Sequence, residues 1–194
     1  MDKLPSYSRV YNLGHRALRD FFDGHAIEVT EKVDGSQFSF AMIDGELHFR
    51  SKGAVILKDA PGMFEAGVRS ICERASGLTE GWIYRGEYLS KPKHNALAYD
   101  SIPKGHVILF GIDLTMGGQD YVSHNFLAAE ARRLDLEVVP LLGYVHQPDM
   151  EWLNETLETE SVLGGQKIEG IVMKNYRRFD QDGKVLMAKF VSEK

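Results

Sequence analysis

The chain has 194 residues, of which 43% are hydrophobic and 26% are charged, and its formal net charge is −5. This composition is typical of one folded domain and excludes a disordered chain, while short apolar runs and a polar N-terminus exclude a membrane span and a signal peptide, so we expect a cytoplasmic protein. A net negative charge gives no general attraction to a polyanion, so contact with nucleic acid would require a local basic surface.

Strands dominate the first half of the chain. Five segments have the apolar pattern of a strand: residues 26–33, 36–43, 46–52, 82–89 and 106–114. Asp44 and Gly45 predict a hairpin turn between the second and the third of them. One helix is predicted over residues 62–76, because its apolar residues recur at helical spacing and the pattern stops before Gly77.

Helices and strands both occur in the second half. Two helices are predicted over residues 123–134 and 149–159, with Ser123 and Asp149 as their N-caps. Three extended segments are predicted over residues 136–145, 168–175 and 184–192, and an Asp-Gly turn joins the last two. Many hairpins and few crossovers predict a mixed α+β fold, with mainly antiparallel sheets flanked by helices, in a single domain over residues 1–194.

Charged residues lie on or beside the segments that should form the core: Lys32, Arg50, Lys52, Glu87, Glu169, Lys174 and Lys189. An unpaired charge is costly there, so repeated opposite charges indicate a site. Cations suit phosphates, and carboxylates suit a divalent metal or a ribose, which is what a nucleoside triphosphate pocket requires. Cys72 is the only cysteine, which excludes an intrachain disulfide and a cysteine-based zinc site.

Six ordered segments resemble the signature of covalent nucleotidyltransferases, the superfamily of ATP-dependent DNA and RNA ligases and mRNA capping enzymes. They are EKVDG at 31–35, RSKG at 50–53, YRGEYL at 84–89, VILFGIDL at 107–114, IEGIVMKN at 168–175 and LMAKFVS at 186–192. Residues 84–114 and the segment YNLGHRALRDFFDG at 11–24 are most similar to the phage and bacterial RNA ligases of the RNA ligase 2-like group. The resemblance implies a nucleotidyltransferase (ATP-grasp-like) domain that uses ATP and Mg²⁺ or Mn²⁺.

By this resemblance Lys32 is the nucleophile, and Asp34 and Gly35 shape the turn that presents it. An amine attacks the α-phosphorus of ATP only when it is deprotonated, a state that burial and neighbouring cations favour. The candidate cations are Lys52, Lys174 and Lys189. The attack would yield lysyl-AMP and pyrophosphate. The AMP would pass to a 5′-phosphate end, and a 3′-hydroxyl would then displace it and seal the RNA ends or a nicked duplex.

The remaining matched residues would form the nucleotide pocket and the surface for RNA. The ATP contacts implied by the resemblance are Glu31 at the adenine, Arg50 at the ribose or an incoming phosphate, Glu87 at the ribose hydroxyl, Phe110 stacked on the adenine, and Lys174 and Lys189 at the α-phosphate. Glu169 would serve the metal. Candidate nucleic-acid contacts are Lys52, Lys91 and Lys93. Phe110 could equally be a core residue, and Glu87 and Glu169 could be ordinary salt-bridge partners.

Two departures from the family pattern keep alternatives open. Met187 stands where related RNA ligases often have the first lysine of a Lys-x-Lys pair, so one phosphate contact is absent unless Lys184 supplies it. Only five residues follow Lys189, so we expect no C-terminal ligase domain. The alternatives are a DNA ligase or guanylyltransferase of the same superfamily, or a nucleotide or RNA-end binding module with weak transferase activity. RNA ends are the expected partner of a monomer, in a host cytoplasm if the protein is phage-encoded.

Overall fold

Two β-sheets organise the chain in the computed structural model, which describes residues 4–115 and 121–192. Sheet A contains β1 (Val10–Asn12), β2 (Ile27–Lys32), β9 (Leu141–Val145), β10 (Gly170–Phe179) and β11 (Val185–Val191), in the order β1-β11-β10-β2-β9. Sheet B contains β3 (Ser36–Ile43), β4 (Glu46–Ser51), β5 (Val55–Ile56), β6 (Ile83–Tyr88), β7 (Val107–Asp113) and β8 (Glu137–Val138), in the order β5-β4-β3-β6-β7-β8. Most pairs of neighbouring strands are antiparallel, so the predicted mixed α+β architecture is confirmed.

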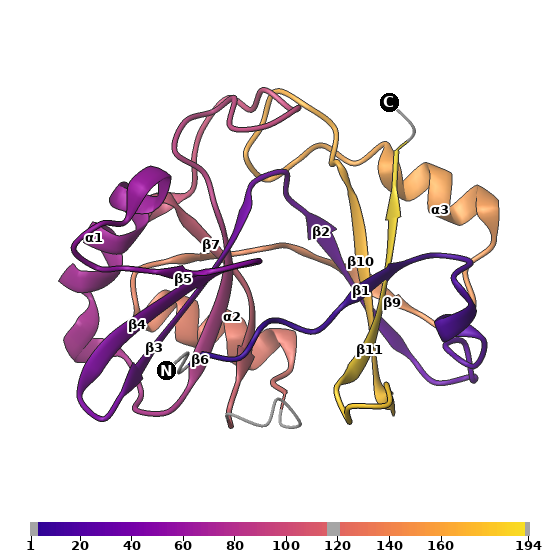
Figure 1. The fold of residues 1–194 in the computed structure, drawn as a ribbon. Helices are drawn as coiled ribbons and strands as arrows, with labels where there is room; N and C mark the ends of the chain where they lie inside the picture. Colours follow the sequence, from indigo (N-terminus) through magenta and orange to yellow (C-terminus); the bar gives the residue numbers. More distant parts are fainter. Residues whose placement is uncertain (1–3, 116–120, 193–194) are drawn as a thin grey trace.

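Among the residues that the structure describes, three α-helices cover the outer sides of the sheets. They are α1 (Glu65–Glu73), α2 (His124–Arg133) and α3 (Met150–Leu157), and the short 3-10 turns are η1 (Arg16–Leu18), η2 (Gly62–Phe64), η3 (Ala75–Gly77) and η4 (Lys104–His106). Figure 1 shows α1 and α2 on the side of sheet B, and α3 on the side of sheet A. Among the described residues no helix combines the length and the apolar character that a membrane crossing needs.

Local sequence signals predicted most of these elements. The β3–β4 hairpin turns at Asp44 and Gly45, whose φ angles of 53° and 74° are the left-handed values that an Asp-Gly turn requires. The Ser123 hydroxyl accepts a hydrogen bond from the Phe126 amide, and the Asp149 carboxylate accepts one from the Trp152 amide. Both predicted N-caps are therefore confirmed.

Residues 136–145 form two strands instead of the one extended segment predicted. β8 pairs with β7 in sheet B, and β9 pairs with β2 in sheet A. Pro140 lies between them, and because proline has no amide hydrogen it interrupts the ladder there. The chain thus passes from one sheet to the other at this point. The short strands β1 and β5 were not predicted, since runs of two or three residues carry no readable alternation.

Each sheet has its own hydrophobic core on its outer face. In sheet B, Phe40 and Leu109 pack with Ile71 of α1 and Leu127 of α2. In sheet A, the outer core consists of Leu18, Phe21, Ile27, Val29, Leu153, Ile168, Ile171, Met173, Leu186 and Ala188. Because side chains alternate along a strand, the residues between these apolar positions point to the opposite face of each sheet. Polar residues therefore gather on the inner faces.

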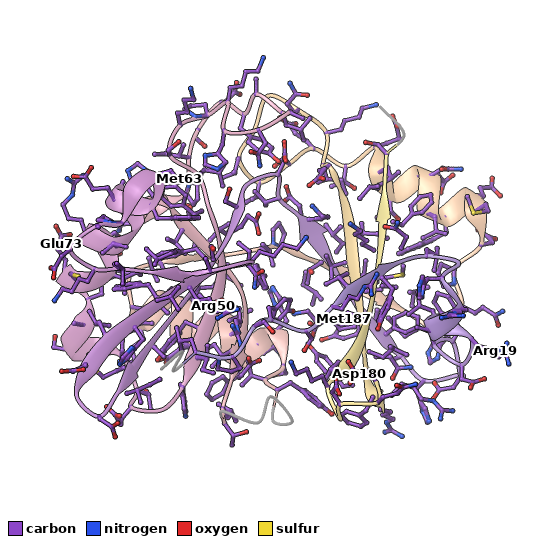
Figure 2. All side chains as sticks on the ribbon, in the orientation of Figure 1. Arg19, Arg50, Met63, Glu73, Asp180 and Met187 are labelled. Atoms are coloured by element: carbon purple, nitrogen blue, oxygen red, sulfur yellow. The ribbon has the colours of Figure 1, made fainter. Side chains whose placement is uncertain are left out.

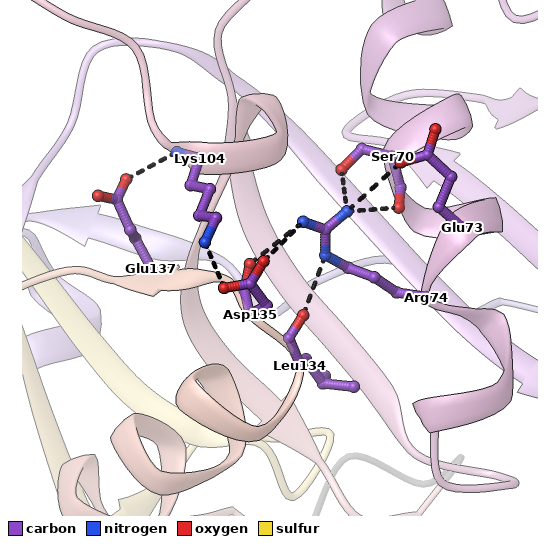
Figure 3. Close-up of polar contacts among 7 residues, drawn as sticks. All are labelled: Ser70, Glu73, Arg74, Lys104, Leu134, Asp135 and Glu137. Carbon is purple, nitrogen blue, oxygen red and sulfur yellow. Dashed lines mark hydrogen bonds and ion pairs between the residues drawn. The ribbon is translucent and has the colours of Figure 1, made fainter.

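Arg74 fixes α1 against the end of α2 (Figure 3). Its guanidinium group donates hydrogen bonds to the carbonyl oxygens of Leu134 and Ser70, each at 2.9 Å, and pairs with the carboxylate of Asp135 at 3.6 Å. Lys104 also pairs with Asp135. This network holds the outer layer of sheet B in place.

The N-terminal segment, residues 4–9, connects the two sheets across their inner faces. Leu4 packs with Ala41 and Ile83 of sheet B. Further along, Val10 and Met187 are paired residues of β1 and β11 in sheet A. Figure 1 shows this indigo segment passing from the side of sheet B to the side of sheet A. Arg85 of β6, which is almost fully buried, donates a hydrogen bond to the Pro5 carbonyl at 3.0 Å and holds the segment there.

Candidate active site

Polar side chains occupy the inner faces of both sheets. On sheet A they include Glu28, Thr30 and Lys32 of β2, Lys174 and Tyr176 of β10, and Lys189 of β11; on sheet B they include Ser39, Arg50, Arg85 and Glu87. The sheets meet through these faces, since the Lys174 amine donates a hydrogen bond at 2.6 Å to the carbonyl oxygen of Phe110 in β7. The strand pattern thus builds a polar space between two apolar cores.

Lys32 lies at the end of β2, where the chain turns into β3. Its Nζ atom donates a hydrogen bond to Glu169 Oε2 at 2.5 Å, and both side chains are 26% exposed. The pairing of β2 with β10 explains this contact, because Gly170 is the residue opposite Lys32 and Glu169 immediately precedes it. Two sequence-predicted residues, 137 positions apart, therefore form one ion pair that solvent can reach.

Glu87 of β6 is the third member of this group. Burial of its carboxyl, followed by the negative charge of Glu169, raises the pKa of Glu87 to about 8, and the positive charge of Lys32 opposes that rise. The backbone of Gly35 also donates a hydrogen bond to it. Because both charges act on Glu87, the structure brings together the predicted nucleophile, the predicted ribose contact and the predicted metal residue.

We expect the Glu87→Gln variant to lose a pH dependence of stability. The ordinary pKa of this carboxyl is 4.5, so its contribution to stability is fully present below that pH and is lost as the pH rises through about 8. The wild-type free energy of unfolding should fall over this interval by on the order of 2 kcal/mol, which is less than the full shift because part of the side chain reaches solvent.

Urea denaturation at several pH values checks this expectation. The difference in the free energy of unfolding between Glu87→Gln and wild type should grow in favour of the variant as the pH rises. Glu158→Gln is a suitable control, because Glu158 forms an exposed ion pair with Lys167. Parallel pH profiles for wild type and Glu87→Gln would contradict the expectation.

The two acidic residues that flank Lys32 hold loops. The Asp34 carboxylate accepts hydrogen bonds from the amides of Ala96 and Leu97, both at 2.8 Å. Glu31 is buried, and its carboxylate accepts hydrogen bonds from the Ser161 hydroxyl at 2.5 Å and the Val162 amide at 3.0 Å. Burial raises the pKa of Glu31.

The loops that Asp34 and Glu31 hold also bind each other, through the Asp100 amide and the Gly164 carbonyl oxygen. Figure 1 shows the two loops together at the top of the molecule, after β6 and before β10. They fix the position of the turn that carries Lys32.

Gly35 fits where no side chain could. A Cβ atom there would come within 2.6 Å of the Tyr88 carbonyl oxygen and 2.7 Å of a carbon atom in the Glu87 side chain. The turn after Lys32 can therefore lie directly against β6. This close approach to β6 gives a physical reason for a glycine at position 35.

Phe110 and Lys174 lie deeper between the sheets. Phe110 is partly buried and packs against an inter-sheet cluster that includes Val33 and Leu163. Lys174 is buried, and burial lowers the pKa of its ammonium group. Glu28 is the residue opposite Lys174 on β2, so Lys174 lies four positions along the ladder from the level of Lys32, about 13 Å at strand spacing. It borders a cavity of about 30 Å³.

Lys189 and Met187 of β11 lie at different ends of the polar space between the sheets. Lys189 is opposite Val172 of β10, and is thus close to the level of Lys32. Met187 is opposite Lys174, and its sulfur accepts a hydrogen bond from the Tyr7 hydroxyl at 3.1 Å. Lys184 lies outside β11 in the hairpin turn, so it does not replace a lysine at position 187.

The predicted phosphate and nucleic-acid contacts lie at the edges of the site. Arg50 is next to Ser39 on the inner face of sheet B and donates a hydrogen bond to the Leu4 carbonyl oxygen at 3.4 Å. Figure 2 shows Arg50 on the side of sheet B and Met187 on the side of sheet A. Lys52, Lys91 and Lys93 are exposed on turns that follow β4 and β6.

Three residues of the inner faces were missed in the sequence. Arg85 forms a hydrogen-bonded ion pair with Asp113 and lies over the Tyr7 ring at 5.6 Å. Tyr7 in turn contacts the Phe110 ring at a centroid distance of 5.1 Å. Val172 occupies the inner-face position between Thr30 and Lys189. Strict alternation along residues 168–175 could have identified Val172, whereas no local signal marks Tyr7.

A divalent metal fits this site only as an ion shared with a substrate. Within residues 4–115 and 121–192 there is no group of three or more His, Cys, Asp or Glu side chains arranged for a metal. Mg²⁺ bound to a nucleotide needs only one or two protein carboxylates, since phosphates and waters supply its other ligands. Glu169, whose carboxylate is partly exposed beside Lys32, is the residue that could supply this ligand.

Two adjoining sheets thus carry a lysine-bearing turn at one end of their inner faces. A sequence model of the RNA ligase family matches residues 25–191. The chain therefore belongs to the RNA ligase family, a family of ATP-dependent nucleotidyltransferase enzymes. Curated proteins, in contrast, gave no match.

Solved structures of a Naegleria gruberi RNA ligase have the same fold. A lysine-to-alanine variant with ATP and manganese is 18% identical to this chain with a TM-score of 0.72, and a lysine-to-methionine variant with AMP and manganese is 19% identical with a TM-score of 0.72. A glutamate-to-alanine variant with AMP and manganese is 19% identical with a TM-score of 0.73. Each match covers 97% of this chain and 56% of the Naegleria protein, so the chain spans little more than half the length of these relatives.

Proposed function

We propose that this chain catalyses the ATP-dependent joining of RNA ends through a covalent AMP on Lys32. The observation that carries the proposal is the convergence of Lys32, Glu169 and Glu87 at the accessible end of the space between the sheets. ATP with Mg²⁺ or Mn²⁺ is the proposed nucleotide and metal, in keeping with the ATP and manganese of the Naegleria structure. A monomer in the cytoplasm is the proposed form.

In the first step the neutral amine of Lys32 attacks the α-phosphorus of ATP, a nitrogen–phosphorus bond forms, and pyrophosphate leaves. Glu169 orients the amine through its 2.5 Å contact. Lys189, close to the same level, is the cation placed to stabilise the negative charge that develops on the α-phosphate. A bound divalent ion would supply further charge stabilisation, with Glu169 as its protein ligand.

The base and the sugar would occupy the space behind the phosphate. Phe110 and Val172 belong to opposite sheets, and we propose that the adenine lies between them. Glu87 is then placed for a ribose hydroxyl, and Lys174 marks the inner end of the pocket. Glu31 would contact the adenine through its backbone, because hydrogen bonds from Ser161 and Val162 already occupy its carboxylate.

Two transfers complete the reaction. The AMP passes to the 5′-phosphate of an RNA, and a 3′-hydroxyl then displaces it as the phosphodiester bond forms. Arg50 is a candidate contact for the incoming phosphate, and Lys52, Lys91 and Lys93 are candidate contacts for the RNA. The loop that carries Lys91 and Lys93 is held by Asp34, two residues from the nucleophile.

Intact-mass measurement after incubation with ATP and Mg²⁺ tests the proposal. We expect one added AMP per chain with ATP and none with GTP. Transfer of that AMP to nicked RNA in preference to nicked DNA would separate an RNA ligase from a DNA ligase. An adduct formed from GTP would indicate a guanylyltransferase, and no adduct from either nucleotide would leave only a binding module.

A further inference from the structure

The segment from Arg9 to Arg19 is the most basic stretch of an acidic protein. It contains three arginines and one histidine and no acidic residue, whereas the whole chain has a formal net charge of −5. It runs through β1 and η1, and Arg9, His15, Arg16 and Arg19 are all exposed. A local positive surface of this kind is what a polyanion would require of an acidic chain.

The three arginines have no carboxylate partner within the part of the chain that the structure describes. Arg9, Arg16 and Arg19 form no hydrogen bond through their guanidinium groups and no ion pair with any residue of 4–115 or 121–192. Arg74, Arg85, Arg133 and Arg178, by contrast, are each paired with a carboxylate. Three guanidinium groups therefore remain available to an external anion.

Aromatic rings lie among these cations. The rings of Tyr11 and His15 stack at a centroid distance of 4.7 Å with an angle of 28° between them. The Arg9 guanidinium group lies over the Tyr11 ring, 5.1 Å from its centre. Stacked planar groups among arginines bind both a base and a phosphate, which is the combination found where proteins hold single-stranded nucleic acid.

The position of the segment connects it to the reacting end. β1 is an edge strand of sheet A and pairs with β11, so that Asn12 lies opposite Lys189. Asn12 is exposed. Tyr11 is opposite Ala188 and packs against the outer core, so a strand of RNA whose 5′-phosphate lies near Lys189 would pass around the edge strand β1 to reach the Tyr11–His15 pair and η1. Figure 2 shows Arg19 projecting outward from this side of the molecule.

We propose that the segment from Arg9 to Arg19, the basic edge of sheet A, binds the phosphodiester backbone of the RNA substrate and stacks one of its bases on the Tyr11–His15 pair. This inference rests on the proposed function, because it assumes that an RNA end is brought to Lys32. The segment is distinct from Lys52, Lys91 and Lys93, which lie on turns next to sheet B. The basic edge would thus provide the local positive surface that an acidic chain needs to bind RNA.

The proposal is tested with a triple variant that carries Arg9→Ala, Arg16→Ala and Arg19→Ala. Its affinity for a fluorescent 5′-phosphorylated single-stranded RNA is measured at several salt concentrations and compared with that of the wild type. We expect affinity at low salt to fall by at least about tenfold, and the slope of log affinity against log salt to become shallower by about 2, because three phosphate contacts are removed. The corresponding triple lysine variant should keep most of the slope, because charge is retained, but bind more weakly than wild type.

Controls separate this idea from its alternatives. Lys58→Ala, Arg69→Ala and Arg132→Ala remove three exposed cations elsewhere and should leave the salt slope unchanged. An unchanged affinity and slope in the arginine variant, with a loss in Lys91→Ala and Lys93→Ala, would overturn the proposal and assign the RNA to the other side. Adenylation of Lys32 needs no RNA. If the wild-type protein formed no AMP adduct, the proposed function would be refuted, whereas RNA binding by the basic edge would still be measured in its own assay.

Discussion

The Lys32→Ala variant is expected to form no AMP adduct while it remains folded. In the proposed mechanism the Lys32 amine attacks phosphorus. No other lysine amine of the site is expected to take its place, because Lys174 is buried with its amine hydrogen-bonded to the Phe110 carbonyl oxygen and Lys189 lies on another strand. The Lys32–Glu169 pair is partly exposed, and pairs of that kind contribute about 0 to 1 kcal/mol to stability. Intact-mass measurement and thermal unfolding together check both parts.

Lys167→Ala is the matched control for this variant. It removes a lysine that also pairs with a glutamate, Glu158, but on the exposed surface away from the inner faces. It should form the adduct at the wild-type rate. An adduct of equal yield in Lys32→Ala, mapped by peptide mass to another lysine, would show that the nucleophile has been assigned to the wrong residue.

The Gly35→Ala variant is expected to lose both stability and adenylation. Its new methyl group would lie 2.6 Å from the Tyr88 carbonyl oxygen, a backbone atom of a central strand that cannot move aside cheaply. Either the turn or β6 must shift, which should lower the free energy of unfolding by about 2 to 4 kcal/mol. Because the turn carries Lys32 and the adjacent Glu87 belongs to β6, adduct formation should slow by at least about a hundredfold.

Gly53→Ala makes the same chemical change where there is room for it. Nothing lies within 4 Å of a Cβ atom at Gly53, so stability and adduct formation should remain close to wild type. Urea denaturation and the time course of adduct formation measure the two effects in both variants. Wild-type behaviour of Gly35→Ala in both measurements would mean that the turn does not need its close approach to β6.

The features that sequence predicted well are those that depend on neighbouring residues. The Asp44–Gly45 turn and the caps at Ser123 and Asp149 each satisfy a local backbone requirement, and each occurs as predicted. The ordered motifs likewise placed Lys32, Glu87 and Glu169 in one site, and the structure brings these three together.

Features that depend on distant parts of the chain were not predictable in this way. Nothing near Glu31 or Asp34 indicates that their carboxylates hold loops at residues 161–162 and 96–97. Lys174 and Lys189 are both lysines, so the sequence does not show which of them lies closer to Lys32. The pairing of β10 with β2 shows that Lys174 lies four positions along the ladder from Lys32. Strand register decides these distances, and register is a property of the assembled sheet.

The N-terminal segment, which passes from sheet B to sheet A, has a consequence for the order in which the two sheets fold. Every strand of sheet B comes from one continuous stretch, residues 36–138, whereas sheet A pairs β1 with β11 from opposite ends of the described chain. Contacts between distant residues form late, because closing a long loop costs entropy. During synthesis, sheet B can fold while β10 and β11 are still being made. Glu169, the ion-pair partner of Lys32, and Lys189 are made after the whole of sheet B, so an incomplete chain carries Lys32 without these two partners.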